Sequence, residues 1–493
     1  MAFPIGDLEQ VLVGGNWRVG RASERVEVLN PSTNEVLFTI QSASAADVDD
    51  AVNAAWQAFR HGPWTRLTGL ERGQLMLRLA ALMKERVAVV AELEARNTGI
   101  PIRQSRLEVV SAARHIEYFA GWAGKVEGTA NQLPKNRFMY TMREPLGVVG
   151  QSVPWNSPLK LMARGCAAAL ACGNTLVIKP SVLACASVLH FGKLAGEAGF
   201  PDGVVNIVPG PGTTTGAALT RHPGIRKLVF TGGLEGGRQV LADAGRNITP
   251  ALIELGGKGP IIVCEDVDLD EAVDGVMSQA FARQGEVCFA GTRLFLPDSI
   301  HEVFVERLAE RARKVRVGDA MDESTEMGPL ISRAHLESVM GYVRGLVDEG
   351  ARMVPGGGLA ADAGSRGNFM RPTILTGARQ GMQATQEEIF GPVLPVIRYK
   401  DLGQAVEDAN ATEFGLAGYV WARDIRQAHR LAAALECGNV FINTYRYESE
   451  VPFGGYKRSG YGREHGVEGL REYTQVKTVV VGLDRWGDIV NQK

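Results

Sequence analysis

The sequence predicts an α/β protein in which helices cover both faces of parallel sheets. From residue 146 onward, short apolar runs rich in β-branched residues alternate with helical segments, and turn residues follow the runs. Strands that are buried on both faces read as such near-continuous apolar runs. The first region contains five of them, at residues 147–150, 175–178, 204–208, 227–230 and 251–255.

A second α/β region is predicted from about Pro260 to residue 460, with apolar runs at residues 260–263, 393–397 and 439–442. Two further segments fit neither region. Residues 136–143 alternate like an exposed strand, and residues 476–481 form a β-branched run. Because edge strands carry unpaired backbone groups, we expect each segment to pair with another subunit.

The first third of the chain is predicted to be mostly helical. Ser44 followed by Asp47 indicates the start of one helix. A second, long helix is predicted from Glu71 to Asn97, because apolar residues recur at helical spacing and Gly99 ends the pattern.

Length and composition favour an ordinary soluble protein. At about 150 residues per unit, 493 residues correspond to about three structural units. The net charge of −2, without a basic stripe, argues against a nucleic-acid or membrane-surface partner. Residues 1–16 contain no Lys or Arg, so we expect no secretory signal. No window approaches the ~18 apolar residues of a membrane span.

The six cysteines show no C-x-x-C pair and no disulfide framework, which predicts reduced thiols and a cytoplasmic protein. We expect five of them to be small buried core residues: Cys166, Cys172, Cys185, Cys264 and Cys437. The eight histidines have no metal-ligand spacing, so no metal site is expected.

Three residues are candidates for chemistry. Cys288 is flanked by glycines, where a thiolate could attack a carbonyl carbon; the alternative is a structural thiol. Glu254 lies in an apolar run, where burial would raise its pKa toward that of a general base. The alternative for Glu254 is a buried ion pair with Lys258. Asn156, in a Pro-flanked turn, could serve as an oxyanion donor or simply form an Asx turn.

Two glycine patterns, at residues 210–216 and 230–237, each follow an apolar run and open a helix. Helix N-termini with bare backbone amides attract phosphate groups. Neither pattern has the usual G-x-G-x-x-G spacing, and the alternative is an ordinary tight turn. Lys179 ends a predicted strand and could reach a ribose or a phosphate; the alternative is a solvated lysine.

Together these segments resemble the aldehyde dehydrogenase superfamily, of the NAD(P)-dependent hydrolytic type, over almost the whole chain. The motifs, in order, are Pro-Trp-Asn at 154–156, Gly-Asn-Thr at 173–175, Lys-Pro at 179–180, Phe-Thr-Gly at 230–232, Glu-Leu-Gly-Gly-Lys at 254–258, Gly-x-x-Cys-x-Ala-Gly ending at Gly291, Glu-Ile-Phe-Gly-Pro-Val at 388–393 and Pro-Phe-Gly-Gly-Tyr-Lys-x-Ser-Gly at 452–460.

The resemblance implies a Rossmann-like parallel-sheet cofactor domain, a second α/β catalytic domain and a small β oligomerisation element. The expected bounds are 1–122 with 146–256 for the dinucleotide-binding domain, 257–460 for the catalytic domain, and 123–145 with 470–493 for the oligomerisation element. It also implies a homodimer or homotetramer.

The resemblance further implies that an aldehyde is oxidised to a carboxylic acid with NAD or NADP. Cys288 would form a thiohemiacetal and then a thioester, Asn156 and the backbone N–H of Cys288 would hold the oxyanion, and Glu254 would activate the hydrolytic water. The cofactor-binding residues by the same resemblance are Val153, Pro154, Trp155, Lys179, Ser181, Val182, Gly212, Gly216, Phe230, Thr231, Gly232, Gly233, Leu255, Glu388 and Phe390.

Two positions depart from the family pattern. Val182 stands where NAD-preferring members place a Glu that binds the ribose hydroxyls. Its absence removes repulsion against a 2′-phosphate, so we expect NADP to be tolerated. Gly233 replaces the usual Ser or Thr, so one hydroxyl contact to pyrophosphate is missing.

The positions that match the family's substrate pocket are Ser157, Leu161, Arg164, Ala282, Val287, Phe289, Tyr445, Tyr447 and Phe453. Arg164 stands where many members have an aromatic residue, and Arg283 and Arg446 are near in sequence. These arginines are expected to form surface ion pairs; the alternative is that they bind an anionic aldehyde.

Three other functions compete with this interpretation. A CoA-acylating dehydrogenase generally lacks the water-activating Glu, which is present here as Glu254. A non-catalytic structural or binding member would be expected to lose the thiol, the amide or the acid. A plain thiol esterase would not need the cofactor cleft.

Overall fold

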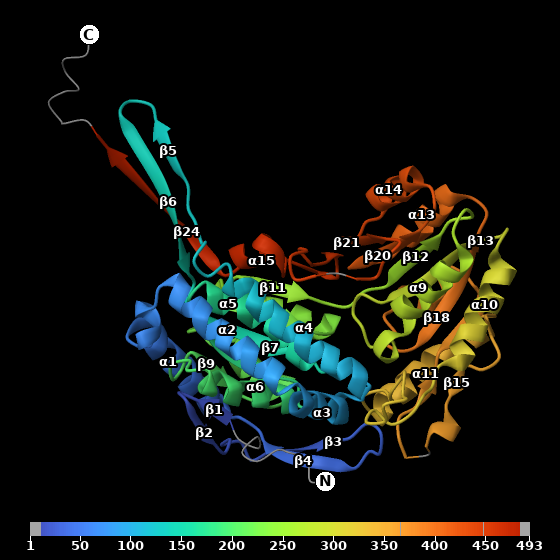
Figure 1. The fold of residues 1–493 in the computed structure, drawn as a ribbon, viewed down its shortest axis with the longest axis horizontal. Coiled ribbons are helices and arrows are strands. Elements are labelled where there is room, and N and C mark those ends of the chain that lie inside the picture. The colour runs from blue at the N-terminus through green and yellow to red at the C-terminus, as the bar shows by residue number, and fades with distance from the viewer. Residues whose placement is uncertain (1–10, 365, 447, 484–493) are drawn as a thin grey trace.

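The computed structural model describes residues 11–364, 366–446 and 448–483. Two lobes lie side by side, and a narrow β-ribbon projects from the first lobe (Figure 1). The predictions for Tyr447, for residues 1–10 of the N-terminal segment and for residues 484–493 of the oligomerisation element lie outside the described residues.

The first lobe is built on an eight-stranded sheet in which the five predicted apolar runs are parallel neighbours. This confirms the predicted parallel-sheet architecture. The strand order is β2 (Asn16–Arg18), β1 (Val11–Val13), β9 (Val205–Ile207), β8 (Thr175–Pro180), β7 (Val148–Val153), β10 (Lys227–Thr231), β11 (Ala251–Glu254) and β23 (Gly460–Tyr461). The outer strands β1, β2 and β23 are antiparallel to their neighbours.

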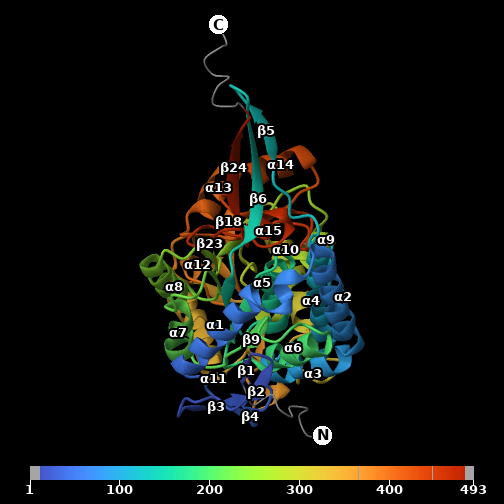
Figure 2. The ribbon, with the colours of Figure 1, turned by 90° about the vertical axis from the view of Figure 1, so that its left-hand side faces the viewer.

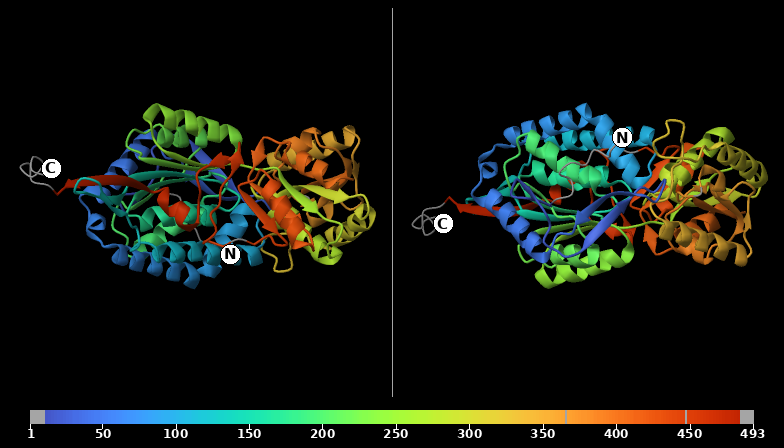
Figure 3. Two further views of the ribbon diagram at one scale, coloured as in Figure 1. Left: turned by 90° about the horizontal axis from the view of Figure 1, so that it is seen from above. Right: turned by 90° about the horizontal axis from the view of Figure 1, so that it is seen from below.

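Helices cover both faces of this sheet (Figure 3). The helices of this lobe are α1 (Ala45–Arg60), α2 (Gly69–Glu85), α3 (Val87–Thr98), α4 (Ile102–Ala120), α5 (Pro158–Ala171), α6 (Ala186–Glu197), α7 (Ala217–Thr220), α8 (Leu234–Asn247) and α15 (Gly466–Arg471), with short turns η2 (Pro63–Arg66) and η3 (Gly212–Gly216). The predicted start of α1 is confirmed, because the Ser44 side chain accepts a bond from the Asp47 backbone N–H and the Asp47 carboxylate accepts one from the Ser44 N–H.

The predicted long helix at residues 71–97 is wrong in one respect, because it is two helices. The chain leaves helical geometry at Arg86, with φ −99° and ψ 19°, between α2 and α3. This break lets α3 reorient, so that Val90 and Leu93 join the same core as the apolar face of α2. The predicted end at Gly99 is confirmed by its left-handed φ of 82°.

The second lobe contains a seven-stranded, mostly parallel sheet. Its order is β14 (Arg352–Met353), β17 (Thr373–Ala378), β18 (Val393–Tyr399), β13 (Gly291–Pro297), β12 (Gly259–Val263), β20 (Ala417–Trp421) and β21 (Asn439–Ile442). Its helices and turns are α9 (Leu269–Phe281), η4 (Ala282–Gly285), α10 (His301–Lys314), α11 (Arg333–Asp348), η5 (Ala361–Ala363), α12 (Gln383–Gln386), α13 (Leu402–Asn410) and α14 (Ile425–Ala434).

Three further strand pairs are β3 (Arg25–Leu29) with β4 (Val36–Gln41), β15 (Gly358–Leu359) with β16 (Met370–Arg371), and β19 (Phe414–Gly415) with β22 (Tyr456–Lys457).

The two predicted edge segments form one antiparallel ribbon that rises from the first lobe (Figure 2). Strand β6 (Arg137–Pro145) pairs over its whole length with β24 (Thr474–Gly482), and β5 (Ala130–Leu133) lies on the other side of β6. The expectation that each segment pairs with another subunit is wrong for β6, which is the central strand between β24 and β5, whereas β24 keeps one free edge and the expectation stays a prediction for it. Among the described residues, no helix is long and apolar enough to cross a membrane.

Candidate active site

The carboxyl ends of β7, β8 and β10 open into a cleft of about 580 Å³, where parallel sheets commonly bind ligands. Ten of the predicted cofactor-binding residues line it: Val153, Pro154, Trp155, Lys179, Gly212, Gly216, Phe230, Thr231, Gly232 and Gly233. Ser181 and Val182 do not line this cleft, and Val182 packs against the core of the first lobe.

The cleft fits a dinucleotide. A Cβ atom added to Gly212 or Gly233 would meet nothing within 4 Å, so the backbone of both residues faces open space. Gly233 precedes the N-terminus of α8, whose free amides attract pyrophosphate. Lys179 is buried with its Nζ 3.4 Å from the Gly210 carbonyl oxygen, which rules out the alternative of a solvated lysine. Burial lowers the pKa of Lys179 to about 8.

A second cavity of about 210 Å³ adjoins the cleft and shares Pro154, Trp155, Thr231, Gly232 and Gly233 with it. All three predicted catalytic residues line this cavity: Cys288, Glu254 and Asn156. Leu255, Glu388 and Phe390, which were predicted to contact the cofactor, line it as well. The sulfur, the carboxylate and the amide thus come from three distant parts of the chain to one cavity.

Cys288 lies between η4 and β13 and is half-buried. Burial raises the pKa of its thiol to about 11; the charge of Arg164 opposes this rise, and the carboxylate of Glu254 adds to it. The resting thiol is therefore protonated at neutral pH. Just before Cys288, Arg283 and Gln284 have φ values of 48° and 60°, a backbone conformation that costs energy in non-glycine residues and clusters at functional sites.

Asn156 is buried in the turn between β7 and α5. Its Nδ2 donates a hydrogen bond to the backbone carbonyl of Glu286 at 2.9 Å. This bond fixes the amide beside the Cys288 loop and uses one of the two hydrogens on Nδ2. The neighbouring Ser157 does not cap α5, because its hydroxyl donates to the carboxylate of Glu108.

Glu254 is the last residue of β11 and is almost completely buried. Burial raises its pKa well above the ordinary value, and the nearby Glu464 carboxylate adds to the rise, whereas Arg164 opposes it. The alternative of an ion pair with Lys258 is wrong, because among residues 11–364, 366–446 and 448–483 neither the Glu254 carboxylate nor Lys258 Nζ has a hydrogen-bonding side-chain partner.

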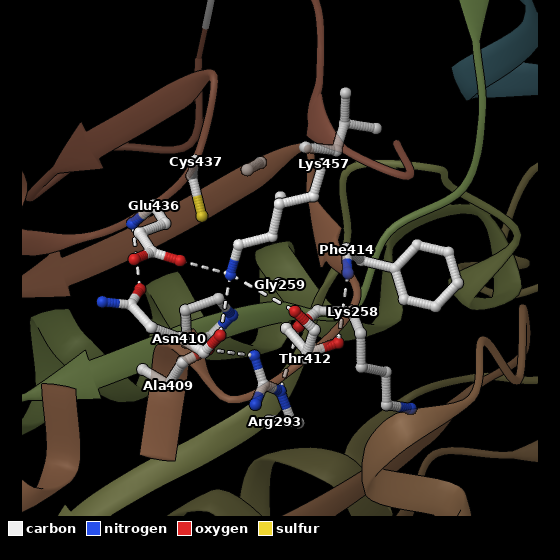
Figure 4. Close-up of a pocket in the computed structure, with 14 residues that line it drawn as sticks. Lys258, Gly259, Arg293, Ala409, Asn410, Thr412, Phe414, Glu436, Cys437 and Lys457 are labelled. Atoms are coloured by element: carbon white, nitrogen blue, oxygen red, sulfur yellow. Dashed lines mark hydrogen bonds and ion pairs between the residues drawn. The ribbon is translucent and has the colours of Figure 1, made fainter. Parts of the chain in front are cut away.

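Lys258 instead lines a small separate pocket in the second lobe (Figure 4). There Arg293 Nε donates to the Lys258 carbonyl at 2.9 Å, and Lys457 Nζ lies 2.6 Å from a carboxylate oxygen of Glu436. Cys437 lines the same pocket and is half-buried, whereas the other four cysteines that were predicted to be core residues are fully buried. The prediction of a buried thiol is therefore wrong for Cys437, which stands at the rim of this pocket.

Glu388 approaches the β11 end so closely that a side chain at Gly256 would have to displace its carboxylate. The Gly257 backbone N–H donates to Glu388 Oε1 at 3.1 Å, and a Cβ atom on Gly256 would lie 1.9 Å from Glu388 Oε2. Burial raises the pKa of Glu388 to about 7. Phe390 packs edge-on against Trp155 at 5.3 Å, with a left-handed φ of 56°.

Only some of the predicted substrate-pocket residues contact one another. Phe289 packs edge-on against Phe453 at 5.7 Å, and the Arg164 guanidinium lies over the Phe453 ring at 4.6 Å. Leu161 and Val287 are buried, whereas Tyr445 is exposed. The expectation that Arg164 forms a surface ion pair is wrong, since it pairs with Glu464 in the interior, 2.5 Å apart.

Sequence reasoning missed three residues of the site. His335 lines the cavity and its Nε2 lies 2.8 Å from the Phe390 carbonyl oxygen. Glu464 accompanies Arg164, and Glu108 accompanies Arg283 at 3.3 Å. A carboxylate between glycines, in Gly462-Arg-Glu-His-Gly466, was the available signal for Glu464; His335 and Glu108 sit on ordinary helical patterns that give no signal.

Comparisons of the sequence and of the structure with known proteins all point to the same family. The aldehyde dehydrogenase family pattern matches residues 17–479. Retinaldehyde dehydrogenase 3 of Mus musculus is 41% identical over 98% of this chain and 95% of its own length. Retinal dehydrogenase 2 of Homo sapiens is 42% identical over 96% and 92%. The NAD+ complex of an aldehyde dehydrogenase from Bacillus cereus superimposes with a TM-score of 0.94, at 38% identity and 96% coverage of each chain.

The matching family pattern, the two-lobed fold and the cavity that joins a thiol to a dinucleotide cleft agree with one another. The chain belongs to the aldehyde dehydrogenase family and is an oxidoreductase that oxidises aldehydes with a nicotinamide cofactor.

Proposed function

We propose that Cys288 is the nucleophile, Asn156 the oxyanion donor and Glu254 the general base of this oxidation. The observation that carries the proposal is that all three side chains line one cavity with Glu388 and Phe390, next to the dinucleotide cleft. The Cys288 sulfur adds to the aldehyde carbon, and the thiol proton passes to solvent, so that Glu254 stays available for the later hydrolysis.

The resulting alkoxide is held by the Asn156 amide and the Cys288 backbone N–H, each worth on the order of 3 kcal/mol. A bound nicotinamide cofactor would supply the acceptor for the hydride that leaves this carbon. Cys288 then carries a thioester. Glu254 removes a proton from water, which attacks the thioester carbon, and the C–S bond breaks to release the carboxylic acid and the thiol.

The test is to mix the purified protein with an aldehyde and NAD+ or NADP+ and to follow absorbance of the reduced cofactor. We expect steady turnover without CoA, no turnover in Cys288→Ala, and a loss of roughly 100-fold or more in Asn156→Ala. Turnover that requires CoA would favour the acylating alternative. Absence of reduced cofactor with every aldehyde would favour a binding role.

For the cofactor, we propose that NADP is used as well as NAD. Val182 supplies no carboxylate to accept the adenosine ribose hydroxyls or to repel a 2′-phosphate. Lys179 lines the cleft and offers a cation to a phosphate. Steady-state kinetics with both cofactors test this; a preference for NAD above about 100-fold would overturn it.

For the assembly, we propose that the chain is a cytoplasmic homodimer or homotetramer, with the β5–β6–β24 ribbon as the oligomerisation element. The ribbon projects from the first lobe and carries exposed apolar residues, among them Val476 and Val480. The proposed domains are residues 1–122 with 146–256, residues 257–460, and residues 123–145 with 470–493. The three largest of the six sheets support this division.

A further inference from the structure

We propose that the substrate is an anionic aldehyde, one that carries a carboxylate at its far end, and that Lys160 and Arg283 bind this carboxylate beside Glu108. The inference rests on the proposed function and adds the substrate class to it. It depends on three elements of the fold, α4, α5 and η4, which place these charged side chains together next to the Cys288 loop.

The three side chains form a compact cluster that is partly exposed. Lys160 Nζ lies 3.6 Å from one oxygen of Glu108, and Arg283 Nη1 lies 3.3 Å from the other. Their side chains are 13–15% exposed, so the cluster is mostly desolvated without being sealed. At such sites, hydrogen bonds between a cation and a carboxylate are strong and directional.

A continuous chain of contacts joins this cluster to the reacting sulfur. Asn156, which lines the catalytic cavity, donates to the Glu286 carbonyl two residues before Cys288. The next residue, Ser157, donates to Glu108. The cluster thus flanks the catalytic cavity on the side of α5, and the dinucleotide cleft is lined by other residues.

The ionisable side chains around the cluster add no further unpaired negative charge, so the electrostatic potential at the cluster is positive. Arg164 lies one helical turn beyond Lys160 on α5 and pairs with Glu464. His115 on α4 and His465 before α15 are buried, and burial together with neighbouring cations holds the pKa of both well below the ordinary value, so they are neutral. Burial also raises the pKa of Glu94 on α3 to about 7.

Glu108 is the firmly ionised carboxylate of the group, since Lys160 and Arg283 outweigh burial and hold its pKa at about 2. An incoming carboxylate would therefore meet two cations, Lys160 and Arg283, and only one anion, Glu108, which lies between them. A purely apolar chain would gain nothing here and would strip water from charged groups, which is costly. The cluster therefore favours a carboxylated aldehyde over a neutral one of equal length.

The experiment compares 5-oxopentanoate with pentanal, which share a five-carbon chain and differ in the carboxylate. We expect kcat/KM to be about 10- to 100-fold higher for 5-oxopentanoate, and we expect Arg283→Gln and Lys160→Gln to reduce this ratio toward one. Arg283→Lys should retain more of it than Arg283→Gln. The matched control is Arg86→Gln, which removes an exposed cation of the Arg86–Glu197 pair and should leave the ratio unchanged.

A second measurement needs no catalytic turnover. In wild-type protein, glutarate should slow alkylation of Cys288 by iodoacetamide, and this protection should be lost in Arg283→Gln. If pentanal is oxidised as well as 5-oxopentanoate and glutarate gives no protection, the substrate class is wrong while the proposed oxidation stands. If neither aldehyde is oxidised but glutarate protects, the proposed oxidation fails and the anion site stands.

Discussion

Arg164 Nη2 lies 2.5 Å from Glu464 Oε2, and both side chains are almost inaccessible to solvent. This pair stands beside Glu254, so one buried cation acts on three acidic groups. The charge of Arg164 lowers the pKa of Glu254, of Glu464 and of the Cys288 thiol, in each case against the effect of burial. Arg164 therefore helps to set the ionisation of the site.

Replacing Arg164 by Gln should destabilise the protein by about 3–5 kcal/mol, because Glu464 would stay buried without its cation. The measurement is urea unfolding followed by fluorescence. The double replacement Arg164→Met with Glu464→Leu should recover part of this loss, since it removes both charges. Arg86→Gln at the surface should cost less than about 1 kcal/mol; an equal loss in both arginine variants would contradict the role of burial.

Alkylation of Cys288 by iodoacetamide should be slow at pH 7 and should rise about tenfold per pH unit up to about pH 10. Only the thiolate reacts, and burial raises the pKa of Cys288 to about 11, so the thiolate fraction grows with pH over this whole range. Mass spectrometry of the Cys288 peptide gives the rates. The Cys437 peptide, whose thiol pKa is also about 11, is the internal comparison. A plateau reached by pH 9 would contradict the raised pKa.

Replacing Glu254 by Gln should stop the reaction after the first oxidation. We expect one equivalent of reduced cofactor per active site in a rapid-mixing burst, followed by turnover slowed about 100- to 10,000-fold. Because the pKa of Glu254 is raised, its carboxyl is protonated at low pH and the wild-type steady-state rate should increase as pH rises. A glutamine cannot titrate, so this increase should disappear. Loss of the burst itself would assign Glu254 to the first step.

Much of the fold could be predicted because its signals are local. The five apolar runs needed only their own β-branched residues to be identified as strands, and the turns after them marked the ligand edge of the sheet. The meeting of Cys288, Glu254 and Asn156 was predicted by the family resemblance, since no spacing in the sequence joins them.

The rest depends on contacts between distant segments, which no local pattern records. The burial of Arg164 arises because α5 meets the segment before α15, where the backbone N–H of Phe453 bonds the Glu464 carbonyl. The pairing of β6 with β24 likewise joins two segments that, taken singly, each predicted an intermolecular partner, and it leaves β24 at the edge of the ribbon.

Gly256→Ala should weaken cofactor binding by about 10- to 100-fold, because the new Cβ would stand 1.9 Å from Glu388 and displace its bond from the Gly257 N–H. Fluorescence titration with NADH or NADPH measures the change in Kd. Gly245→Ala is the matched control: it lies within α8, where a Cβ meets nothing within 4 Å. Equal affinity in wild type and Gly256→Ala would show that the position of Glu388 does not matter for binding.

Lysine substitutions on the exposed face of β24 test whether the ribbon holds the subunits together. Val476 and Val480 lie on one face of β24 and are 54% and 56% exposed, although β-branched apolar side chains at a sheet edge usually contact a partner. Val476→Lys with Val480→Lys should shift the protein from a dimer or tetramer to a monomer in light scattering coupled to size exclusion, because like charges would face each other across the covered edge. Ile425→Lys, which changes a 55% exposed residue on α14, should leave the mass unchanged. A wild-type protein that is monomeric at micromolar concentration would overturn the assignment of the ribbon to assembly.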